Sequence, residues 1–336
     1  MKKAKGTIRM SDVARVLGVS PMTVSNSFRN PHLVTDATRQ KVIETATKLG
    51  YVPNTIAGNL VSGQSKVIAV MTPSIRHSSF ADMIDALEQS LAKEGYSLIM
   101  SLVETREREV EALRALIGRR VDGVVIAGEL QDATARELVV KSGTPVVETW
   151  HLHENMTDMS AGFSEHDAAA DAVRFMIEAG RRRIGMIGYH PSTNRRLIER
   201  INGFRTAMNE AGGNSANVVL MDASINGYEA GAKGILQLID VLPEIDGVFC
   251  MTDILAVGAM FESTRLGWPV PGRLAIMGYG DYDIAAQIPP GLTTIHTPGV
   301  EIGVESASLL LDRLAQKPGI AHQRRVAYRL VSRGSV

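Results

Sequence analysis

The chain has 336 residues, of which 45% are hydrophobic and 21% charged, so it can bury more than one hydrophobic core. It contains no apolar run near the roughly 20 residues that cross a bilayer, and its charged N-terminus lacks the apolar centre of a signal peptide. Its one cysteine, Cys250, stands in an apolar run, which predicts a buried thiol and excludes an intramolecular disulfide. These features predict a cytoplasmic protein without membrane contact.

Charge is distributed unevenly along the chain. Residues 1–66 hold ten Lys or Arg and three acidic residues, a net charge of +7. Because the whole chain has 36 basic and 36 acidic residues, residues 67–336 carry a net charge of −7. A basic segment joined to an acidic body indicates a nucleic-acid-binding arm, whose affinity would fall steeply with salt. A merely solvated basic surface is the alternative.

Residues 10–26 contain two short helical patterns separated at Gly18, with their apolar residues on one face. Ser20 followed by Pro21 is typical of a helix start, because Ser accepts from free backbone N–H groups and Pro fits the first helical position. A helix, a glycine-containing turn and a capped second helix predict a helix-turn-helix. In that motif the second helix enters the DNA major groove.

A third helix is expected to begin after its cap, Thr35, and to end near Leu49, before Gly50. The next segment, residues 55–65, is too short and too rich in glycine to form a stable helix alone. Such a segment can fold when DNA binds, because the cost of ordering it is then offset. The sequence therefore predicts a hinge that becomes helical on DNA.

The remainder of the chain alternates short apolar runs of strand type with helical patterns. Two series of four runs are present: 67–71, 97–100, 123–127 and 145–147, then 184–187, 218–221, 248–251 and 274–277. This alternation predicts an α/β fold with two lobes, each built on a parallel sheet covered by helices. Ligands in such folds bind beyond the carboxyl ends of the strands, so the loops after the strands would line a cleft between the lobes.

These loops carry polar, charged and aromatic side chains that suit a small anionic or polyhydroxylated ligand. The candidates are Arg76, Ser79, Phe80, Glu148, Trp150, Phe163, Arg200, Thr252, Asp253 and Asp283. Trp150 could stack on the ligand or belong to the core, and Asp253 could bind a hydroxyl or cap the following helix. Glu148 could balance Arg200 or accept from a ligand hydroxyl.

No catalytic group or cofactor site is evident in the sequence. It has neither a phosphate-binding loop of the type G-x-x-x-x-G-K-[ST] nor a zinc motif H-E-x-x-H. His151 and His153 form an H-x-H pair, which is a weak metal signal and is more often found on a surface. We therefore expect no metal, no cofactor and no enzymatic activity.

The N-terminal segment resembles the LacI/GalR family of bacterial transcription regulators. The similarity rests on Asp12-Val13-Ala14, Gly18-Val19-Ser20, Thr23-Val24-Ser25, Gly50-Tyr51-Val52-Pro53-Asn54, Ala57 and Leu60. Four stretches resemble the gluconate-operon repressor type within this family: Met22-Thr23-Val24-Ser25, Phe28-Arg29-Asn30-Pro31, Pro145-Val146-Val147-Glu148 and Asp246-Gly247-Val248-Phe249-Cys250. The resemblance implies a helix-turn-helix head, a hinge helix and a two-lobed body like that of periplasmic binding proteins.

The resemblance also implies how DNA is read. The start of the second helix would contact base edges and phosphates, and Leu60 would enter the minor groove as an apolar wedge. Asn26 replaces the family's usual Arg, so it would favour adenine over guanine, unless it contacts a phosphate instead. The implied DNA-binding residues are Ser20, Pro21, Met22, Thr23, Ser25, Asn26, Asn54, Ala57 and Leu60.

For the body, the resemblance implies a small-molecule effector. Arg200, four residues before Phe204, matches the family's effector-binding Arg, which forks onto ligand oxygens. Thr252 stands where the family usually has Asn. The gluconate-type similarity favours a sugar acid, or its phosphorylated or lactone relative, and so do the available arginines, Arg76, Arg195, Arg196 and Arg200.

The expected organisation is a DNA-binding domain at 1–53, a hinge at 54–65 and an effector-binding and dimerisation domain at 66–336. One lobe would comprise roughly 66–164 with 293–325, and the other 165–292 with 326–336. A homodimer would place two heads on a pseudo-palindromic, double-stranded operator as a repressor, and the effector would alter lobe closure and hinge folding. The alternatives are a two-lobed sugar-binding protein and a sugar-processing enzyme.

Overall fold

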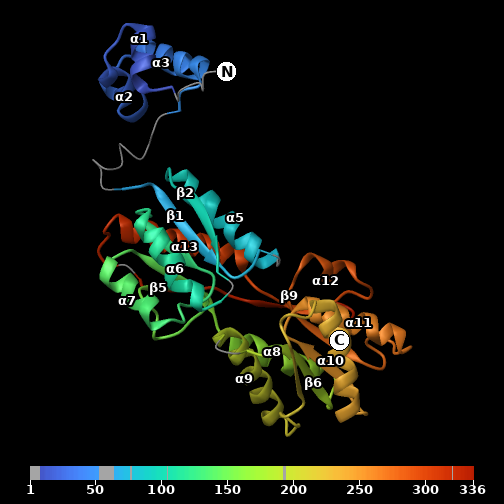
Figure 1. Cartoon of the computed structure of the whole chain (residues 1–336). Helices are drawn as coiled ribbons and strands as arrows, with labels where there is room; N and C mark the ends of the chain where they lie inside the picture. Colours follow the sequence, from blue (N-terminus) through green and yellow to red (C-terminus); the bar gives the residue numbers. More distant parts are fainter. Residues whose placement is uncertain (1–7, 53–63, 76–77, 104, 192–193, 320) are drawn as a thin grey trace, which may run out of the picture. The chain divides into compact units, whose positions relative to one another are not determined.

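The structure is a computed structural model of the chain that describes residues 8–52, 64–75, 78–103, 105–191, 194–319 and 321–336. The chain divides into two compact units, Met1–Lys66 and Val67–Val336 (Figure 1). The described part of the first unit is helical. The second unit combines helices with two sheets.

The first unit contains helices α1 (Met10–Leu17), α2 (Pro21–Arg29) and α3 (Asp36–Leu49), with a 3₁₀ turn η1 (Pro31–Leu33) before α3. The turn after α1 is made at Gly18, whose φ of 66° lies in the left-handed region. The Ser20 hydroxyl accepts from the backbone N–H of Thr23 at 3.1 Å and so caps α2. These contacts form the helix-turn-helix that the sequence predicts.

A small apolar core holds the three helices together. It contains Val13 and Ala14 of α1, Val24 of α2, and Val42 and Ala46 of α3. The rings of Phe28 and Tyr51 pack beside this core with centroids 6.2 Å apart. The predicted cap of the third helix is also present, because the Thr35 hydroxyl accepts from the N–H of Thr38 at 3.3 Å.

The second unit contains two six-stranded sheets, and we call the parts built on them lobe 1 and lobe 2. The lobe 1 sheet has the order β11-β5-β4-β3-β1-β2, with parallel neighbours throughout. Its strands are β1 (Val67–Thr72), β2 (Ser97–Leu102), β3 (Gly123–Ile126), β4 (Val146–His151), β5 (Met159–Phe163) and β11 (Gln323–Arg325).

The lobe 2 sheet has the order β12-β10-β9-β8-β6-β7. Its neighbours are parallel except for β10 and β12, which are antiparallel. Its strands are β6 (Ile184–Tyr189), β7 (Val218–Met221), β8 (Gly247–Cys250), β9 (Ala275–Gly280), β10 (Thr293–His296) and β12 (Arg329–Val331).

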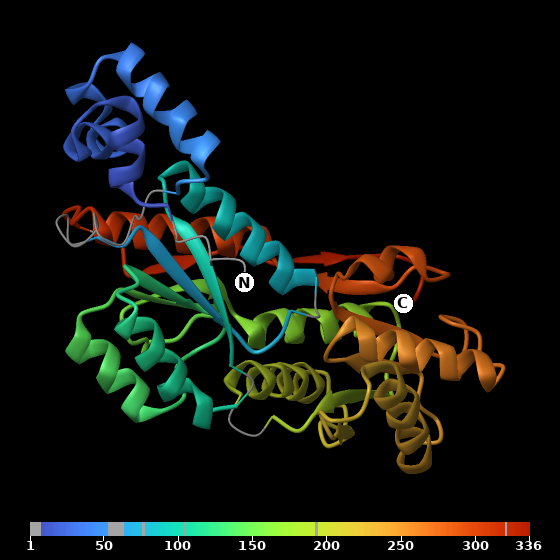
Figure 2. The same ribbon diagram turned by 45° about the horizontal axis from the view of Figure 1, so that its top comes forward.

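Helices cover the sheets of both lobes (Figure 2). Lobe 1 has α5 (Ser78–Lys93), α6 (Glu107–Gly118), α7 (Ala133–Ser142) and α13 (Gly299–Leu314). Lobe 2 has α8 (Glu165–Glu178), α9 (Arg195–Glu210), α10 (Gly227–Val241), α11 (Asp253–Arg265) and α12 (Asp283–Gln287). The helices pack in pairs: α5 with α13, α6 with α7, α8 with α9 and α10 with α11.

The eight strands expected from the apolar runs are all present, but one lobe assignment was wrong. Residues 293–296 are expected in the first lobe, whereas they form β10 and pair with β9 in the lobe 2 sheet. The reason is burial, since Leu292 and Ile295 complete the apolar core beside β9. The chain therefore passes between the lobes after β10, as well as between β5 and α8 and between β11 and β12.

Gly203 determines how closely α9 approaches α8. A Cβ atom at this position would lie 2.1 Å from the carbonyl oxygen of His166 and 2.9 Å from the Cβ of Ala169. Both neighbours belong to α8, so a side chain at Gly203 would force the two helix backbones apart. Because Arg200 lies one turn earlier on α9, the same close packing brings its side chain to α8.

We expect Gly203→Ala to lower the free energy of unfolding of the second unit by about 2–3 kcal/mol, because the two helices would have to separate. Gly118→Ala in α6 is the control, since a Cβ there meets no atom within 4 Å. That control should be neutral or stabilising by up to about 1 kcal/mol. Chemical denaturation of both variants measures the difference, and equal stabilities would contradict the tight packing of α8 on α9.

Candidate functional site

The start of α2 gathers six residues predicted to contact DNA. The first three are exposed and the next three partly buried, in chain order Ser20, Pro21, Met22, Thr23, Ser25 and Asn26. The first turn of α2 has no acidic residue, so the partial positive charge at its N-terminus is not neutralised and can attract a phosphate. The other predicted contacts, Asn54, Ala57 and Leu60, lie outside the described residues.

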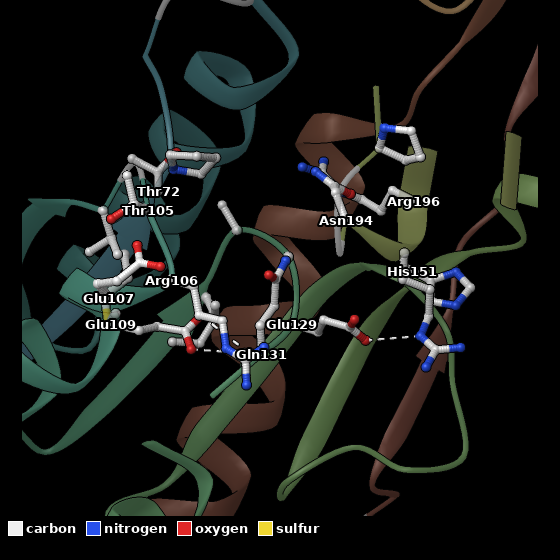
Figure 3. A pocket seen from close by; sticks show the side chains of 18 residues that line it. Thr72, Thr105, Arg106, Glu107, Glu109, Glu129, Gln131, His151, Asn194 and Arg196 are labelled. Carbon is white, nitrogen blue, oxygen red and sulfur yellow. Dashed lines mark hydrogen bonds and ion pairs between the residues drawn. The ribbon is translucent and has the colours of Figure 1, made fainter. Parts of the chain in front are cut away.

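The second unit contains a cavity of about 540 Å³ where the carboxyl ends of the lobe 1 strands face lobe 2 (Figure 3). Lobe 2 contributes the segment before α9 and its first turn, namely Pro191, Asn194, Arg195 and Arg196. Lobe 1 contributes Met71, Thr72, Pro73, Val103, Thr105, Arg106, Glu107, Glu109, Ile126, Ala127, Gly128, Glu129, Gln131 and His151. The cavity therefore lies at the edge of the sheet where the strand pattern predicts a ligand.

Carboxylates, an amide and hydroxyls gather on the lobe 1 wall, and Figure 3 shows them on one side of the cavity. Glu109 is buried, and its carboxylate accepts from the backbone N–H groups of Gln131 at 3.1 Å and Asp132 at 2.8 Å. Burial raises the pKa of Glu109. Its carboxylate thus fixes the loop after β3, which presents Glu129 and Gln131 to the cavity.

An ion pair joins the two walls. The Arg195 Nε lies 3.4 Å from Oε2 of Glu129. On its other side, this oxygen lies 3.7 Å from Nε2 of His153, which in turn lies 3.5 Å from Oε2 of Glu148. Glu129 is therefore held between a cation of lobe 2 and a histidine of lobe 1.

Arg196 differs from the other arginines of the cavity. Arg106 lies 3.5 Å from Asp132 and Arg195 lies 3.4 Å from Glu129, but the Arg196 guanidinium has no hydrogen bond or ion pair within the described part of the chain. Its Cζ lies 5.3 Å from the centroid of the Phe80 ring. Burial lowers the pKa of Arg196. A partly buried cation without a counter-ion favours an anionic ligand.

His151 belongs to the same side of the cavity as Arg196 (Figure 3). Its Nδ1 is buried and has no hydrogen-bond partner among the described residues. Burial lowers the pKa of His151 to about 4, so the ring is neutral at neutral pH. The sequence favours a surface position for His151 and His153, but both are partly buried and their rings stack with centroids 5.8 Å apart.

None of the described effector-binding candidates lines this cavity, and Arg76 lies outside the described residues. Two of them pack together near Arg196: the Phe80 ring, which the Arg196 guanidinium approaches, packs edge-on against Trp150 with centroids 5.1 Å apart. The Trp150 Nε1 is buried without a hydrogen-bond partner in the part of the chain that is described. Ser79 shares a hydrogen bond of 2.9 Å with Thr297, at the passage from β10 to α13.

The acidic candidates mainly support the fold. Glu148 is fully buried, and its carboxylate accepts from the N–H groups of Leu130 at 2.8 Å and Thr157 at 2.9 Å. The buried carboxylate of Asp253 accepts from the hydroxyl of Thr294 and the N–H of Tyr282, both at 2.6 Å. These contacts use both carboxylates to hold loops and strands together.

The remaining candidates have different surroundings. Thr252, rather than Asp253, caps α11, because the Thr252 hydroxyl accepts from the N–H of Leu255 at 3.3 Å. Phe163 is buried with its ring 5.8 Å from that of Tyr328, and Asp283 is exposed at the start of α12.

Arg200 faces the interior of lobe 2. Only 8% of its surface is exposed, and its Nε donates to Oε2 of Glu165 at 2.7 Å. Glu165, which the sequence did not single out, belongs to the first turn of α8. The cavity residues Thr72, Glu129 and Gln131 were also missed, although they stand at or just after the ends of β1 and β3, where the rule about post-strand loops could have found them.

Comparison with known proteins assigns both units. Residues 9–54 match the family model of bacterial regulatory proteins of the lacI family, and residues 173–336 match that of a periplasmic binding protein-like domain. The chain is 32% identical over 315 residues to the HTH-type transcriptional regulator GntR of Escherichia coli K12, which covers 94% of this chain and 93% of the relative. The chain belongs to the LacI family.

Other LacI-family proteins are similar over nearly the full length. The HTH-type transcriptional repressor CytR of Escherichia coli K12 is 30% identical over 340 residues, covering 99% of this chain and 98% of the relative. The crystal structure of a LacI-family regulator from Silicibacter pomeroyi has a TM-score of 0.89 at 27% identity, covering 98% of this chain and 99% of that chain.

Membership of the LacI family makes this protein a DNA-binding transcriptional regulator. The helix-turn-helix and the two-lobed α/β body that the sequence predicts are confirmed. No helix among the described residues is long and apolar enough to cross a membrane. Within the same residues, no group of three or more His, Cys, Asp or Glu side chains is placed to hold a metal ion.

The buried Asp253 predicts a pH dependence of stability. Burial raises the pKa of this carboxyl from 3.8 to about 6. Because the folded-state pKa lies above the unfolded value, the stability that protonated Asp253 contributes is complete below pH 3.8 and is lost as the pH rises through about 6.

Asp253→Asn does not titrate, so the difference in Tm between wild type and variant should change mainly between about pH 4 and pH 6. Asp283→Asn, at an exposed position, is the control and should show no such change. Thermal unfolding across this range and at neutral pH provides the measurement. A wild-type-to-variant difference that stays constant with pH would contradict the raised pKa.

Proposed function

We propose that this LacI-family regulator is a repressor whose operator binding is controlled by a sugar acid, such as gluconate or a phosphorylated relative, held in the cavity. The observation that carries the proposal is Arg196, a partly buried cation that lines the cavity without a counter-ion among the described residues. A guanidinium binds a carboxylate or phosphate through charge-assisted hydrogen bonds, which are roughly twice as strong as neutral ones.

The opposite wall suits a chain of hydroxyl groups. It presents Glu129, Gln131, Thr72 and Thr105, whose oxygens can accept from hydroxyls. A neutral sugar would leave Arg196 without a counter-ion. A ligand with an anionic group at each end would place one of them beside the Glu129 carboxylate, which would repel it. A polyhydroxy acid satisfies both walls, and the similarity of several sequence stretches to the gluconate-operon repressor type supports the same ligand class.

The proposal extends to the whole chain. Residues 1–53 would bind DNA, 54–65 would form the hinge, and 66–336 would bind the effector and form a homodimer on a pseudo-palindromic operator. A ligand that contacts both lobes would change the arrangement of the lobes and so the spacing of the two hinges in the dimer. The hinge spacing would in turn decide whether Leu60 enters the minor groove. A coupling of about 1–3 kcal/mol between the two sites would change operator affinity about 5- to 150-fold.

We further propose that the protein acts in the cytoplasm and has no enzymatic activity. A general base works best with a pKa near the operating pH, but burial lowers the pKa of His151, which lines the cavity, to about 4. His151 would therefore be a weak general base at neutral pH. After incubation with the protein, a sugar acid should be recovered unchanged.

The ligand class is tested by comparing the binding of two matched ligands, gluconate and glucitol. Wild type is expected to bind gluconate at least about 10-fold more tightly than glucitol, which replaces the carboxylate by a hydroxymethyl group, because a charge-assisted hydrogen bond contributes about 1.5–3 kcal/mol. Arg196→Met should abolish this preference, as measured by isothermal titration calorimetry.

Arg205→Met is the control, because Arg205 is exposed on the same helix α9. It should bind gluconate as wild type does. Equal affinities of wild type for gluconate and glucitol would refute the sugar-acid assignment while leaving the family assignment untouched.

Asn26→Arg is expected to shift the preferred base at one position of each operator half-site from adenine to guanine, with a discrimination of about 1–3 kcal/mol. Selection from a library of operators randomised at each position measures the preference. If the variant weakens or strengthens binding equally on all sequences, Asn26 contacts a phosphate rather than a base.

A further inference from the structure

Helix α9 carries two arginines one turn apart whose surroundings are opposite. Arg196 lines the cavity and has no hydrogen bond or ion pair within the described residues. Arg200 is buried and has every nitrogen of its guanidinium engaged: Nε donates to Oε2 of Glu165 at 2.7 Å, Nη2 donates to Oε1 of Glu165 at 3.1 Å, and Nη1 donates to the carbonyl of Met251 at 3.0 Å.

Both carboxylate oxygens of Glu165 accept hydrogen bonds from Arg200. It is fully buried, and the hydroxyl of Tyr279 donates to the same Oε2 that Arg200 contacts. The Arg200 Cζ lies 3.9 Å from the centroid of the Tyr279 ring, so the guanidinium is sandwiched between a carboxylate and an aromatic face. A buried charge pair with this geometry is costly to break from one side only.

The other arginines that line the cavity also have carboxylate partners. Arg106 lies 3.5 Å from Asp132, and Arg195 lies 3.4 Å from Glu129. Arg200 is paired with Glu165. Among the described arginines that line the cavity, only Arg196 lacks a counter-ion within the described residues. Among the described residues, Arg196 is therefore the positive charge of the cavity that has no carboxylate partner and can be offered to a ligand.

We infer that Glu165 determines specificity by occupying Arg200 internally, so that the cavity accepts a ligand with one anionic group, received by Arg196, and rejects the corresponding diacid. This inference rests on the proposed function and adds to it. It predicts preference for an aldonate over an aldarate of the same carbon chain, because the second carboxylate of the aldarate would lack a cation and approach Glu129.

The pairing itself is tested without any ligand. In a double-mutant cycle with Glu165→Gln and Arg200→Met, each single variant should lower the Tm by at least about 4 °C, and the double variant should lose much less than the sum. The control cycle uses Arg174 and Glu210, which also join α8 to α9, at 2.9 Å, but are about half exposed. That cycle should show additive effects, and additivity at Glu165 and Arg200 as well would overturn the pairing.

The selectivity is tested with gluconate, glucarate and glucitol, which share one six-carbon chain and carry one, two and no carboxylates. Wild type should bind gluconate about 10-fold more tightly than glucarate or glucitol. Glu165→Gln frees Arg200 and should raise the affinity for glucarate relative to gluconate about 10-fold. Glu210→Gln, the exposed control, should leave the ratio unchanged.

A second variant keeps the test decisive if Glu165→Gln folds poorly. Glu165→Gln combined with Arg200→Met removes both charges and should retain the preference for gluconate over glucitol, because Arg196 is still present. Loss of that preference would show that Arg200 receives the anion and would overturn the inference. If wild type binds neither acid, the proposed function fails. If wild type prefers gluconate to glucitol but Glu165→Gln leaves the affinity for glucarate relative to gluconate unchanged, the inference fails and the proposed function stands.

Discussion

A carboxylate that is fully removed from water must be neutralised by neighbouring groups, and Glu165 is in this position. Arg200 neutralises its charge and the Tyr279 hydroxyl donates a hydrogen bond to it. Arg200 reaches Glu165 because Gly203 lets α9 pack closely on α8. Glu165 begins α8 directly after the chain passes from lobe 1 to lobe 2. The pair therefore anchors α9 beside that passage, and Arg196, one turn earlier on α9, is the cation that we propose faces the ligand.

The cavity follows from the direction of the strands. Parallel strands end at one edge of a sheet, and at that edge of lobe 1 the chain presents the loops after β1 to β4, opposite the start of α9. In the proposed function, the lobe 1 wall accepts hydrogen bonds from ligand hydroxyls and Arg196 on the lobe 2 wall offers a positive charge. A ligand that binds both walls contacts both lobes. Such a ligand can favour one arrangement of the two lobes over another.

Local signals in the sequence predicted most of the fold. Gly18, Ser20 and Pro21 define the helix-turn-helix through contacts within a few residues, and eight apolar runs marked eight strands. The lobe of β10 could not be inferred in this way, because it depends on packing against β9. The site shows the same limit: the sequence marks Arg200 as a cation, but its availability depends on Glu165, 35 positions away.

The most direct test of this account is a crystal structure of the protein with bound gluconate. The account predicts that the ligand carboxylate lies within hydrogen-bond distance of the Arg196 guanidinium, that its hydroxyls face Glu129 and Gln131, and that the Arg200–Glu165 pair is intact. A carboxylate bound to Arg200 with Glu165 displaced, or gluconate bound outside this cavity, would contradict it.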